Sequence, residues 1–217
     1  MASEMREGLF ITFEGPEGCG KSTQSARLHK ELRAEGVDAV LTAEPGGTDL
    51  GNRIREILLH KDEVSLGRMA ELLLFEADRA QHVEEFIVPN LREGRVVLCD
   101  RYNTATFAYQ GHGLGMDLGL LRRIDRICRK GVDPDLVLLL DVDVEIGLKR
   151  AGSGGPADRM EKRDRCFHEK VRQGYLRLAE EAGDRIRVIS SGDDIETTYQ
   201  AVRKEVHVFI ERYKRTE

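Results

Sequence analysis

The segment from Gly15 to Ser22 reads GPEGCGKS and carries the residues best suited to bind phosphate. Its glycines allow consecutive backbone N–H groups to curve around phosphate oxygens. The Lys21 ammonium can reach the β- and γ-phosphates of a nucleotide, and the Ser22 hydroxyl can bind Mg²⁺. An apolar run, Leu9–Phe13, precedes the segment, and a helical pattern follows it. This order predicts a nucleotide-binding loop formed by Gly15, Pro16, Glu17, Gly18, Cys19, Gly20, Lys21, Ser22 and Thr23.

Asp100 and Arg101 directly follow another apolar run, Val96–Cys99. Ligands of open parallel sheets bind at the carboxyl ends of the strands. An acid at that place can hold Mg²⁺ or its water shell, and an adjacent arginine can pair with a phosphate. Asp141, after the run Leu136–Leu140, is an alternative metal ligand. Asp100 is favoured because Arg101 supplies the charge that faces a phosphate.

Phe75 and Arg79 lie four positions apart in a helical pattern, and they share one face with Leu72 and Val83. An arginine on an apolar face is costly unless an anion or an acceptor meets it. The pair is therefore a candidate site in which a base stacks on Phe75 while Arg79 contacts base or phosphate. The alternative is that Phe75 belongs to the core and Arg79 reaches solvent.

The elements that must position these residues follow from the hydrophobic pattern. Nearly continuous apolar runs are typical of strands covered on both faces of a parallel sheet, and the helical patterns between them can form crossovers. We expect an α/β fold with about five parallel strands and helices on both faces, in one domain spanning residues 1–217. The expected strands are Leu9–Phe13, Val37–Leu41, Val96–Cys99, Leu136–Leu140 and Ile186–Ile189, and the expected helices lie near 22–35, 50–60, 66–88, 117–130, 164–182 and 194–213.

The composition of the chain argues against several classes of protein. The net charge of −5 argues against a general nucleic-acid binder, which would carry a basic surface. The basic stripe Arg122, Arg126 and Arg129 is interpreted as a solvated helix face. The cysteines show no paired metal spacing, the first residues contain no apolar signal core, and the longest aliphatic run is too short to span a bilayer. We therefore expect a cytoplasmic protein without membrane or nucleic-acid partners.

The segment GSGGPA, residues 152–157, lies between Arg150 and Arg159. Phosphoryl-transfer enzymes need a segment that closes over the nucleotide and excludes water. The segment is therefore a candidate short lid, about residues 150–163, and the alternative is an ordinary surface loop.

A larger set of motifs identifies a family. FITFEGPEGCGKST, EPGGTDLGNRIR, LLFEADRAQHV, CDRY, AYQG, PDLVLLLDVD and DRME resemble the bacterial thymidylate kinases, P-loop nucleoside-monophosphate kinases, in order and spacing over essentially the whole chain. The resemblance implies a three-layer P-loop fold and Mg²⁺-dependent transfer of the ATP γ-phosphate to dTMP, giving dTDP, in a homodimer. The alternatives are another nucleoside-monophosphate kinase and a nucleotide-binding switch with weak transfer activity.

The resemblance also implies a dTMP site. Phe75 can stack on thymine, and Arg79 together with Thr106 and Gln110 can satisfy the polar edge of the base. Besides these, Arg55 and Arg101 are assigned to the monophosphate and Tyr109 to the 2′ position. The full implied set is Glu44, Arg55, Phe75, Arg79, Arg101, Thr106, Tyr109 and Gln110.

Glu17 places a carboxylate inside a phosphate loop, where it repels the ligand unless a cation intervenes. The resemblance assigns Glu17 to the organisation of the metal and the acceptor phosphate. The expected metal-binding residues are then Ser22, Asp100 and Glu17.

The chain departs from the family pattern in the lid, because Gly152 and Gly154 stand where lid arginines are usual and Gly18 leaves the phosphate loop without one. Some cation must still contact the transferring phosphoryl group. Arg159 is favoured because it matches the Asp-Arg element of the family, and the other candidates are Arg150, Lys162 and Arg163. Arg150 is expected to contact ATP. The expected catalytic residues are Lys21, Arg101, Arg159 and Glu17.

Overall fold

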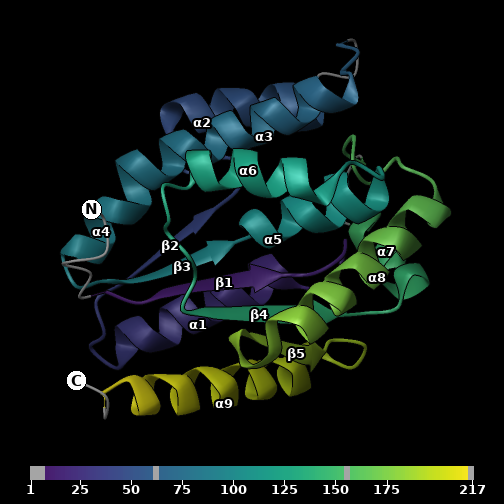
Figure 1. Ribbon diagram of the computed structural model, residues 1–217. Helices are drawn as coiled ribbons and strands as arrows, with labels where there is room; N and C mark the ends of the chain where they lie inside the picture. Colours follow the sequence, from purple (N-terminus) through teal and green to yellow (C-terminus); the bar gives the residue numbers. More distant parts are fainter. Residues whose placement is uncertain (1–7, 61–63, 154–156, 215–217) are drawn as a thin grey trace.

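Five parallel strands form one sheet in the order β2-β3-β1-β4-β5, within residues 8–60, 64–153 and 157–214, which the computed structural model describes (Figure 1). The central strand β1 pairs with β3 on one side and β4 on the other, so that Ile11 lies opposite Leu98 and Leu136. The strands are β1 (Phe10–Glu14), β2 (Ala39–Ala43), β3 (Val96–Asp100), β4 (Leu136–Asp141) and β5 (Ile186–Ser190).

Each central strand contributes to two cores, which explains why its apolar residues are continuous. Ile11 and Phe13 of β1 pack on one face together with Leu138 of β4. Phe10 and Leu139 point to the opposite face and join two other clusters there. The sheet is therefore the middle layer of a three-layer arrangement, as the sequence predicts.

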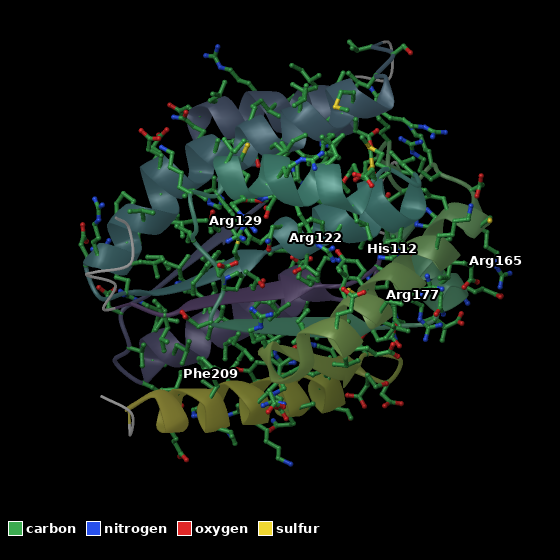
Figure 2. All side chains as sticks on the ribbon, viewed as in Figure 1. His112, Arg122, Arg129, Arg165, Arg177 and Phe209 are labelled. Carbon is green, nitrogen blue, oxygen red and sulfur yellow. The ribbon has the colours of Figure 1, made fainter. Side chains whose placement is uncertain are left out.

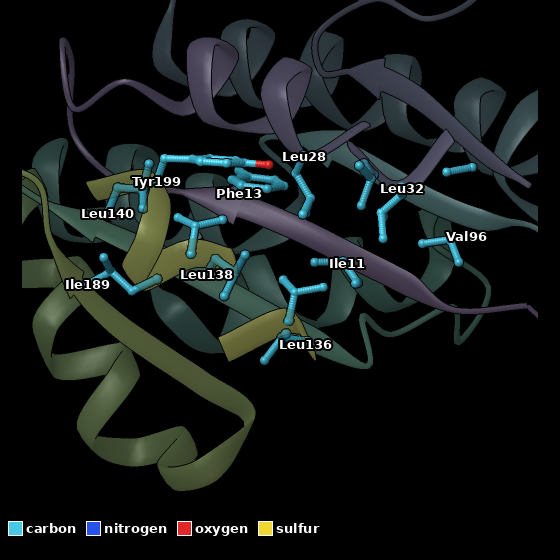
Figure 3. Packing of buried hydrophobic residues seen from close by; sticks show 14 of the residues in the cluster. Ile11, Phe13, Leu28, Leu32, Val96, Leu136, Leu138, Leu140, Ile189 and Tyr199 are labelled. Atoms are coloured by element: carbon cyan, nitrogen blue, oxygen red, sulfur yellow. The ribbon is translucent and has the colours of Figure 1, made fainter. Parts of the chain in front are cut away.

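Helices α1 (Lys21–Ala34) and α9 (Ile195–Lys214) cover the first face of the sheet (Figure 1). Leu28 and Leu32 of α1 pack against β1, and Tyr199 of α9 closes the same cluster (Figure 3). All three side chains are buried, with Leu28 fully so. Because α1 begins at the end of the predicted phosphate loop, this core holds the loop against the sheet.

The remaining long helices cover the second face or the carboxyl edge of the sheet (Figure 1). Several are continued by π-helical turns, in which an extra residue per turn re-aims the side chains. These elements are α2 (Asp49–Arg55), a π segment (Glu56–His60), α3 (Arg68–His82), a π segment (Val83–Ile87), α4 (Val88–Arg92), α5 (Asn103–Thr106), a π segment (Phe107–Gly113), α6 (Leu118–Cys128), α7 (Val144–Ala151), α8 (Arg165–Ala182) and a 3₁₀ turn (Gly183–Arg185).

The predicted elements are all present, with shifted ends. β2 begins at Ala39 rather than Val37, because the Val37 N–H donates to the Leu32 carbonyl and completes the end of α1. The helical run predicted to end at residue 88 continues through α4 to Arg92, and a π segment precedes Pro89, which cannot donate a backbone hydrogen bond.

Two helical stretches were not predicted, α7 and the run from Asn103 through the π segment ending at Gly113. α7 has only eight residues, which is too few to establish a helical period, and the second stretch begins within a polar segment and continues as a π segment, which does not keep the α-helical period. Of the candidate lid, Gly154 to Pro156 lie outside the described residues. No helix in the described part of the chain is long and apolar enough to cross a membrane.

Candidate nucleotide-binding active site

The predicted phosphate loop connects β1 to α1. Gly15, Gly18 and Gly20 have φ values of 139°, 65° and 91°, a region that residues with a Cβ rarely adopt. The helix starts at Lys21, so its positive dipole end faces the loop. This backbone fits a phosphate ligand.

Lys21 folds back over the loop. Its Nζ donates to the carbonyl oxygens of Gly15, at 3.2 Å, and Pro16, at 2.9 Å, and lies 3.4 Å from Cys19 Sγ. The Lys21 side chain is buried within the site, and hydrogen bonds to the loop carbonyls hold its ammonium in place. A cation held in this way needs little reorganisation to stabilise charge on a bound phosphate.

Asp100 and Asp141, the two alternative acids for the metal site, have different hydrogen-bond partners. The Ser22 hydroxyl donates to Asp100 at the end of β3, so an oxygen from the loop and a carboxylate from the sheet lie together. The Asp141 carboxylate instead accepts hydrogen bonds from both Nε and Nη2 of Arg172, at 2.8 and 2.9 Å. Asp141 is thus committed to an ion pair, which favours Asp100 as the metal-site acid.

Arg101 and Glu17 form an ion pair of 2.9 Å between Nη2 and Oε2, and the Tyr109 hydroxyl donates to Glu17 Oε1 at 2.7 Å. Burial raises the pKa of Glu17, but the opposing charges of Arg101 and Lys21 and the hydrogen bond from Tyr109 outweigh it and hold the pKa at about 2. Glu17 is therefore an ionised carboxylate at neutral pH.

A second carboxyl group, Glu14, lies behind this pair and was not predicted. It is fully buried and accepts hydrogen bonds from the Tyr102 N–H, at 2.8 Å, and the Tyr175 hydroxyl, at 3.0 Å. Burial raises the pKa of Glu14 to about 7, against the lowering effect of Arg101. An acid at the end of an otherwise apolar strand was the available sequence signal.

Arg101 has φ of 70°, the left-handed region that is uncommon for a residue with a side chain. The bond from the next N–H, that of Tyr102, to Glu14 holds this turn. The turn brings Arg101 Nη1 within 3.1 Å of the Gly15 carbonyl and 3.3 Å of the Tyr175 hydroxyl. The guanidinium is thereby placed over the entrance of the phosphate loop.

The alternative interpretation, in which Arg79 reaches solvent, is wrong. The Arg79 side chain is only 3% exposed. Its Nε donates to Glu44 at 3.0 Å, and its Nη1 donates to Glu76 at 2.7 Å and to the Thr106 hydroxyl at 2.9 Å. His82 also contacts Glu44, at 3.0 Å. Buried acceptors from three elements thus hold the guanidinium in one orientation.

One cavity of about 1580 Å³ joins the phosphate loop to the region around Arg79. Its walls include every predicted site residue except Gly15, Pro16 and Arg159. The predicted members in contact with the cavity are Glu17, Gly18, Cys19, Gly20, Lys21, Ser22, Thr23, Glu44, Arg55, Phe75, Arg79, Asp100, Arg101, Thr106, Tyr109, Gln110 and Arg150.

Comparison with known proteins places this site in a family. A sequence model of the family described as Thymidylate kinase matches residues 13–202. The chain belongs to the thymidylate kinase family. This confirms the family and the enzyme class predicted from the motifs.

Individual thymidylate kinases are similar over most of their length. Those of Ectopseudomonas mendocina and Deinococcus radiodurans are 48% and 49% identical to this chain, over 87% and 86% of it and 90% of each relative. A crystal structure of thymidylate kinase from Ehrlichia chaffeensis has a TM-score of 0.75 and 35% identity, covering 92% of this chain and 98% of that one. The predicted P-loop α/β fold is thereby confirmed.

The candidate lid arginines of this thymidylate kinase family member have separate partners. Arg150 donates to the carbonyls of Ser191, Gly192 and Asp193, at 2.6, 3.0 and 3.0 Å, and so supports the loop between β5 and α9. Arg159 donates from Nε to the Leu58 carbonyl, at 3.0 Å, and lies outside the cavity walls. Its assignment to the transferring phosphoryl group stays a prediction.

The loop between β5 and α9 also forms part of the cavity wall and was missed in the sequence. The available signal was its position, since it follows a strand at the carboxyl edge of the sheet. The missed lining residues of this loop and the start of α9 are Ser191, Asp193, Asp194, Ile195, Glu196 and Thr198.

Arg122 and Arg129 of the basic stripe of α6 are labelled in Figure 2, and none of the three stripe arginines lines the cavity. Arg122 lies 3.4 Å from Glu181 of α8, and Arg129 pairs with Asp125 and Asp133, at 2.7 and 2.5 Å. Arg122 and Arg126 are exposed, as expected for a solvated face, but that interpretation is wrong for Arg129, whose side chain is only 15% exposed and pairs with the buried Asp125.

Proposed function

We propose that the protein transfers the γ-phosphoryl group of ATP to dTMP, giving dTDP and ADP, with both nucleotides bound in the single cavity. Family membership supports the reaction. The observation that carries the assignment of the site is the continuity of this cavity from the phosphate loop, past Arg101, to Phe75 and Arg79. A donor and an acceptor can therefore meet at Arg101.

The ATP end of the cavity is the phosphate loop. Its N–H groups and the start of α1 provide positive potential, and Lys21 adds a full charge. The wall formed by the loop between β5 and α9, which Arg150 supports, is available to the rest of the ATP molecule.

Mg²⁺ fits the donor set near the loop, because hard cations prefer oxygen ligands. Ser22 and Asp100 present a hydroxyl and a carboxylate side by side, and Glu17 presents an ionised carboxylate in the same cavity. Ser22 and Asp100 would hold the ion directly, whereas Glu17, whose carboxylate oxygens accept from Arg101 and Tyr109, would contact only its water shell. When bound, Mg²⁺ neutralises charge on the transferring phosphates.

The dTMP end is the pocket around Arg79. Phe75 is a partly buried ring on the cavity wall, suited to stacking on a base. Arg79 has no hydrogen bond from Nη2 to any other described residue, so this N–H₂ group is available to a base carbonyl. Arg55, anchored by its 2.8 Å bond to the Pro45 carbonyl, and Arg101 are assigned to the monophosphate, and Tyr109 to the 2′ position.

Chemistry in this arrangement is mainly positioning and electrostatic stabilisation. An oxygen of the dTMP phosphate forms a bond to the γ-phosphorus while the bond from that phosphorus to the ADP oxygen breaks, in line. Lys21 and Arg101 stabilise the negative charge, and Glu17 keeps the Arg101 guanidinium oriented. Arg159 is assigned to the transferring phosphoryl group. To reach that group, its side chain must break the hydrogen bond from Nε to the Leu58 carbonyl.

A coupled assay with ATP, Mg²⁺ and dTMP, dUMP, dCMP, dGMP or AMP tests the proposal. We expect dTMP to be preferred over dUMP by about 10–200-fold in kcat/KM, because one methyl group contributes roughly 1–3 kcal/mol. Purine nucleotides should be rejected more strongly on shape. Comparable rates with dGMP or AMP would indicate another nucleoside-monophosphate kinase, and tight binding without turnover would indicate a nucleotide-binding switch.

A cytoplasmic homodimer is also part of the proposal. Exposed apolar side chains on the neighbouring helices α3 and α6, namely Met69, Leu73 and Ile127, supply surface that a second copy can cover. Light scattering after size exclusion tests this, with Ile127→Asp expected to shift the mass from dimer toward monomer. A monomeric parent protein would contradict it.

A further inference from the structure

Glu71 of α3 is a buried carboxylate that lies behind the proposed base pocket rather than on the cavity wall. It accepts a 3.0 Å hydrogen bond from Gln110 Nε2 on one oxygen and a 2.7 Å hydrogen bond from Arg163 Nη2 on the other. Its side chain is 2% exposed, and that of Arg163 is 33% exposed. The two bonds link α3, the π segment after α5 and the segment before α8.

The chemistry of a carboxylate constrains the Gln110 amide. An ionised carboxylate can only accept hydrogen bonds, whereas an amide has a donating and an accepting end. Gln110 must therefore turn its NH₂ group toward Glu71. Its Oε1 receives no hydrogen bond within the described part of the chain and is not among the buried unpaired atoms found there. Since Gln110 is on the cavity wall, this carbonyl oxygen is offered to a ligand.

We propose that Glu71 is a specificity-determining positioning residue, which fixes the Gln110 amide so that the pocket accepts an imide edge and rejects a cytosine edge. This inference rests on the proposed function of the cavity. Thymine and uracil present an N3–H donor beside a carbonyl, which suits the Gln110 carbonyl and the free Nη2 of Arg79. Cytosine presents an unprotonated N3 and an amino group, so both contacts become mismatched.

Without Glu71, the Gln110 amide can rotate and present its NH₂ group, which suits the N3 acceptor of cytosine. Arg163 supplies the countercharge that a buried carboxylate requires. The nucleotide base is thus selected by a residue that does not touch it, through the orientation of one that does.

Glu71→Gln tests the proposal, since it keeps the shape of the side chain but allows either end of its amide to face Gln110. The measured quantities are kcat/KM for dTMP and for dCMP, with ATP and Mg²⁺. We expect the dTMP-to-dCMP ratio to fall at least about 10-fold, because a mismatched polar contact in a pocket is strongly selective. Asp78→Asn is the matched control, since Asp78 is a buried carboxyl on the same helix that bonds the Gly46 N–H and not Gln110. Its ratio should match that of the parent protein.

A purely structural role of Glu71 would lower both rates in proportion, and an unchanged ratio in folded Glu71→Gln would overturn the inference. Arg163→Gln provides a second test at a partly exposed position, with a smaller fall in the same ratio expected and an unchanged ratio counting against the proposal. If the parent protein does not phosphorylate dTMP at all, the proposed function fails instead. The two failures are therefore distinguishable.

Discussion

Gly18 of the phosphate loop packs backbone against backbone on Gly147 of α7. A Cβ at Gly18 would overlap the Gly147 carbonyl oxygen, and a Cβ at Gly147 would overlap the carbonyl oxygen of Glu17. The two glycines thus let a helix support the loop at a distance that no other residue allows. Because Glu17 is part of this contact, the position of the helix affects the Arg101 ion pair.

Gly147→Ala is expected to destabilise the protein and to weaken ATP binding. In the interior of an isolated helix, replacing glycine by alanine stabilises the helix by about 1 kcal/mol. A loss of stability in the protein would therefore come from the packing against the loop. The added Cβ must push the loop or the helix away, which disturbs the N–H groups that face phosphate. Chemical denaturation and calorimetric titration with ATP measure both effects. Gly67→Ala, directly before α3 and outside the candidate lid, is the control, because its Cβ would meet no other atom within 4 Å. Equal behaviour of the two variants would contradict the packing argument.

Lys21→Ala should lower kcat by at least about 100-fold, equivalent to about 2.7 kcal/mol, with the fold retained. The ammonium is held by two loop carbonyls beside the expected phosphates, so its loss removes charge stabilisation in the transition state. Steady-state kinetics and circular dichroism measure the outcome. Lys30→Ala, at an exposed position of the same helix, should retain parental kcat. A folded Lys21→Ala protein with unchanged kcat would defeat the assignment.

Glu14→Gln should change how stability depends on pH. The pKa of Glu14 is raised from 4.5 to about 7 in the folded protein, so this carboxyl binds a proton on folding between these values. Its contribution to the free energy of unfolding is therefore greatest below pH 4.5 and is lost as the pH rises through 7. The glutamine variant lacks this loss and retains an acceptor for Tyr102. The free energy of unfolding of the variant, relative to that of the parent protein, should therefore rise by on the order of 1–3 kcal/mol between pH 4.5 and pH 8.

Urea denaturation of both proteins at the two pH values measures this gain, because all other titrating groups cancel in the difference. A difference in stability that stays constant with pH would show that Glu14 titrates in its ordinary range.

Arg159→Ala is expected to reduce kcat much more than it raises KM for either substrate. That pattern marks an interaction made mainly in the transition state. Arg159→Lys should recover only part of the activity, because a point charge does not reproduce a planar guanidinium. Steady-state kinetics with both substrates varied distinguishes the cases. If kcat stays within about twofold for Arg159→Ala but is abolished by Arg150→Ala or Arg163→Ala, the role belongs to that arginine instead.

Local pattern was enough to predict the phosphate loop, the five strands and the family. Apolar runs, helical periods and the spacing from Gly15 to Ser22 are properties of neighbouring residues, and the backbone responds to them directly. The ends of elements were less predictable. β2 starts late because the Val37 N–H is used by the end of α1, a competition that no propensity describes.

Only the tertiary structure decided which polar groups meet. Glu17 lies 84 positions from Arg101, and Glu71 lies 92 positions from Arg163. Their pairing depends on strand order, on crossover length and on π-helical turns that rotate Tyr109 and Gln110 into place. Asp100 and Asp141 each follow an apolar strand, and the neighbouring Arg101 favours Asp100 in the sequence. Only the structure shows that Asp100 faces Ser22 and that Asp141 is held by Arg172. Short-range sequence determines the elements, whereas burial and electrostatic pairing between distant segments determine how each charge is used.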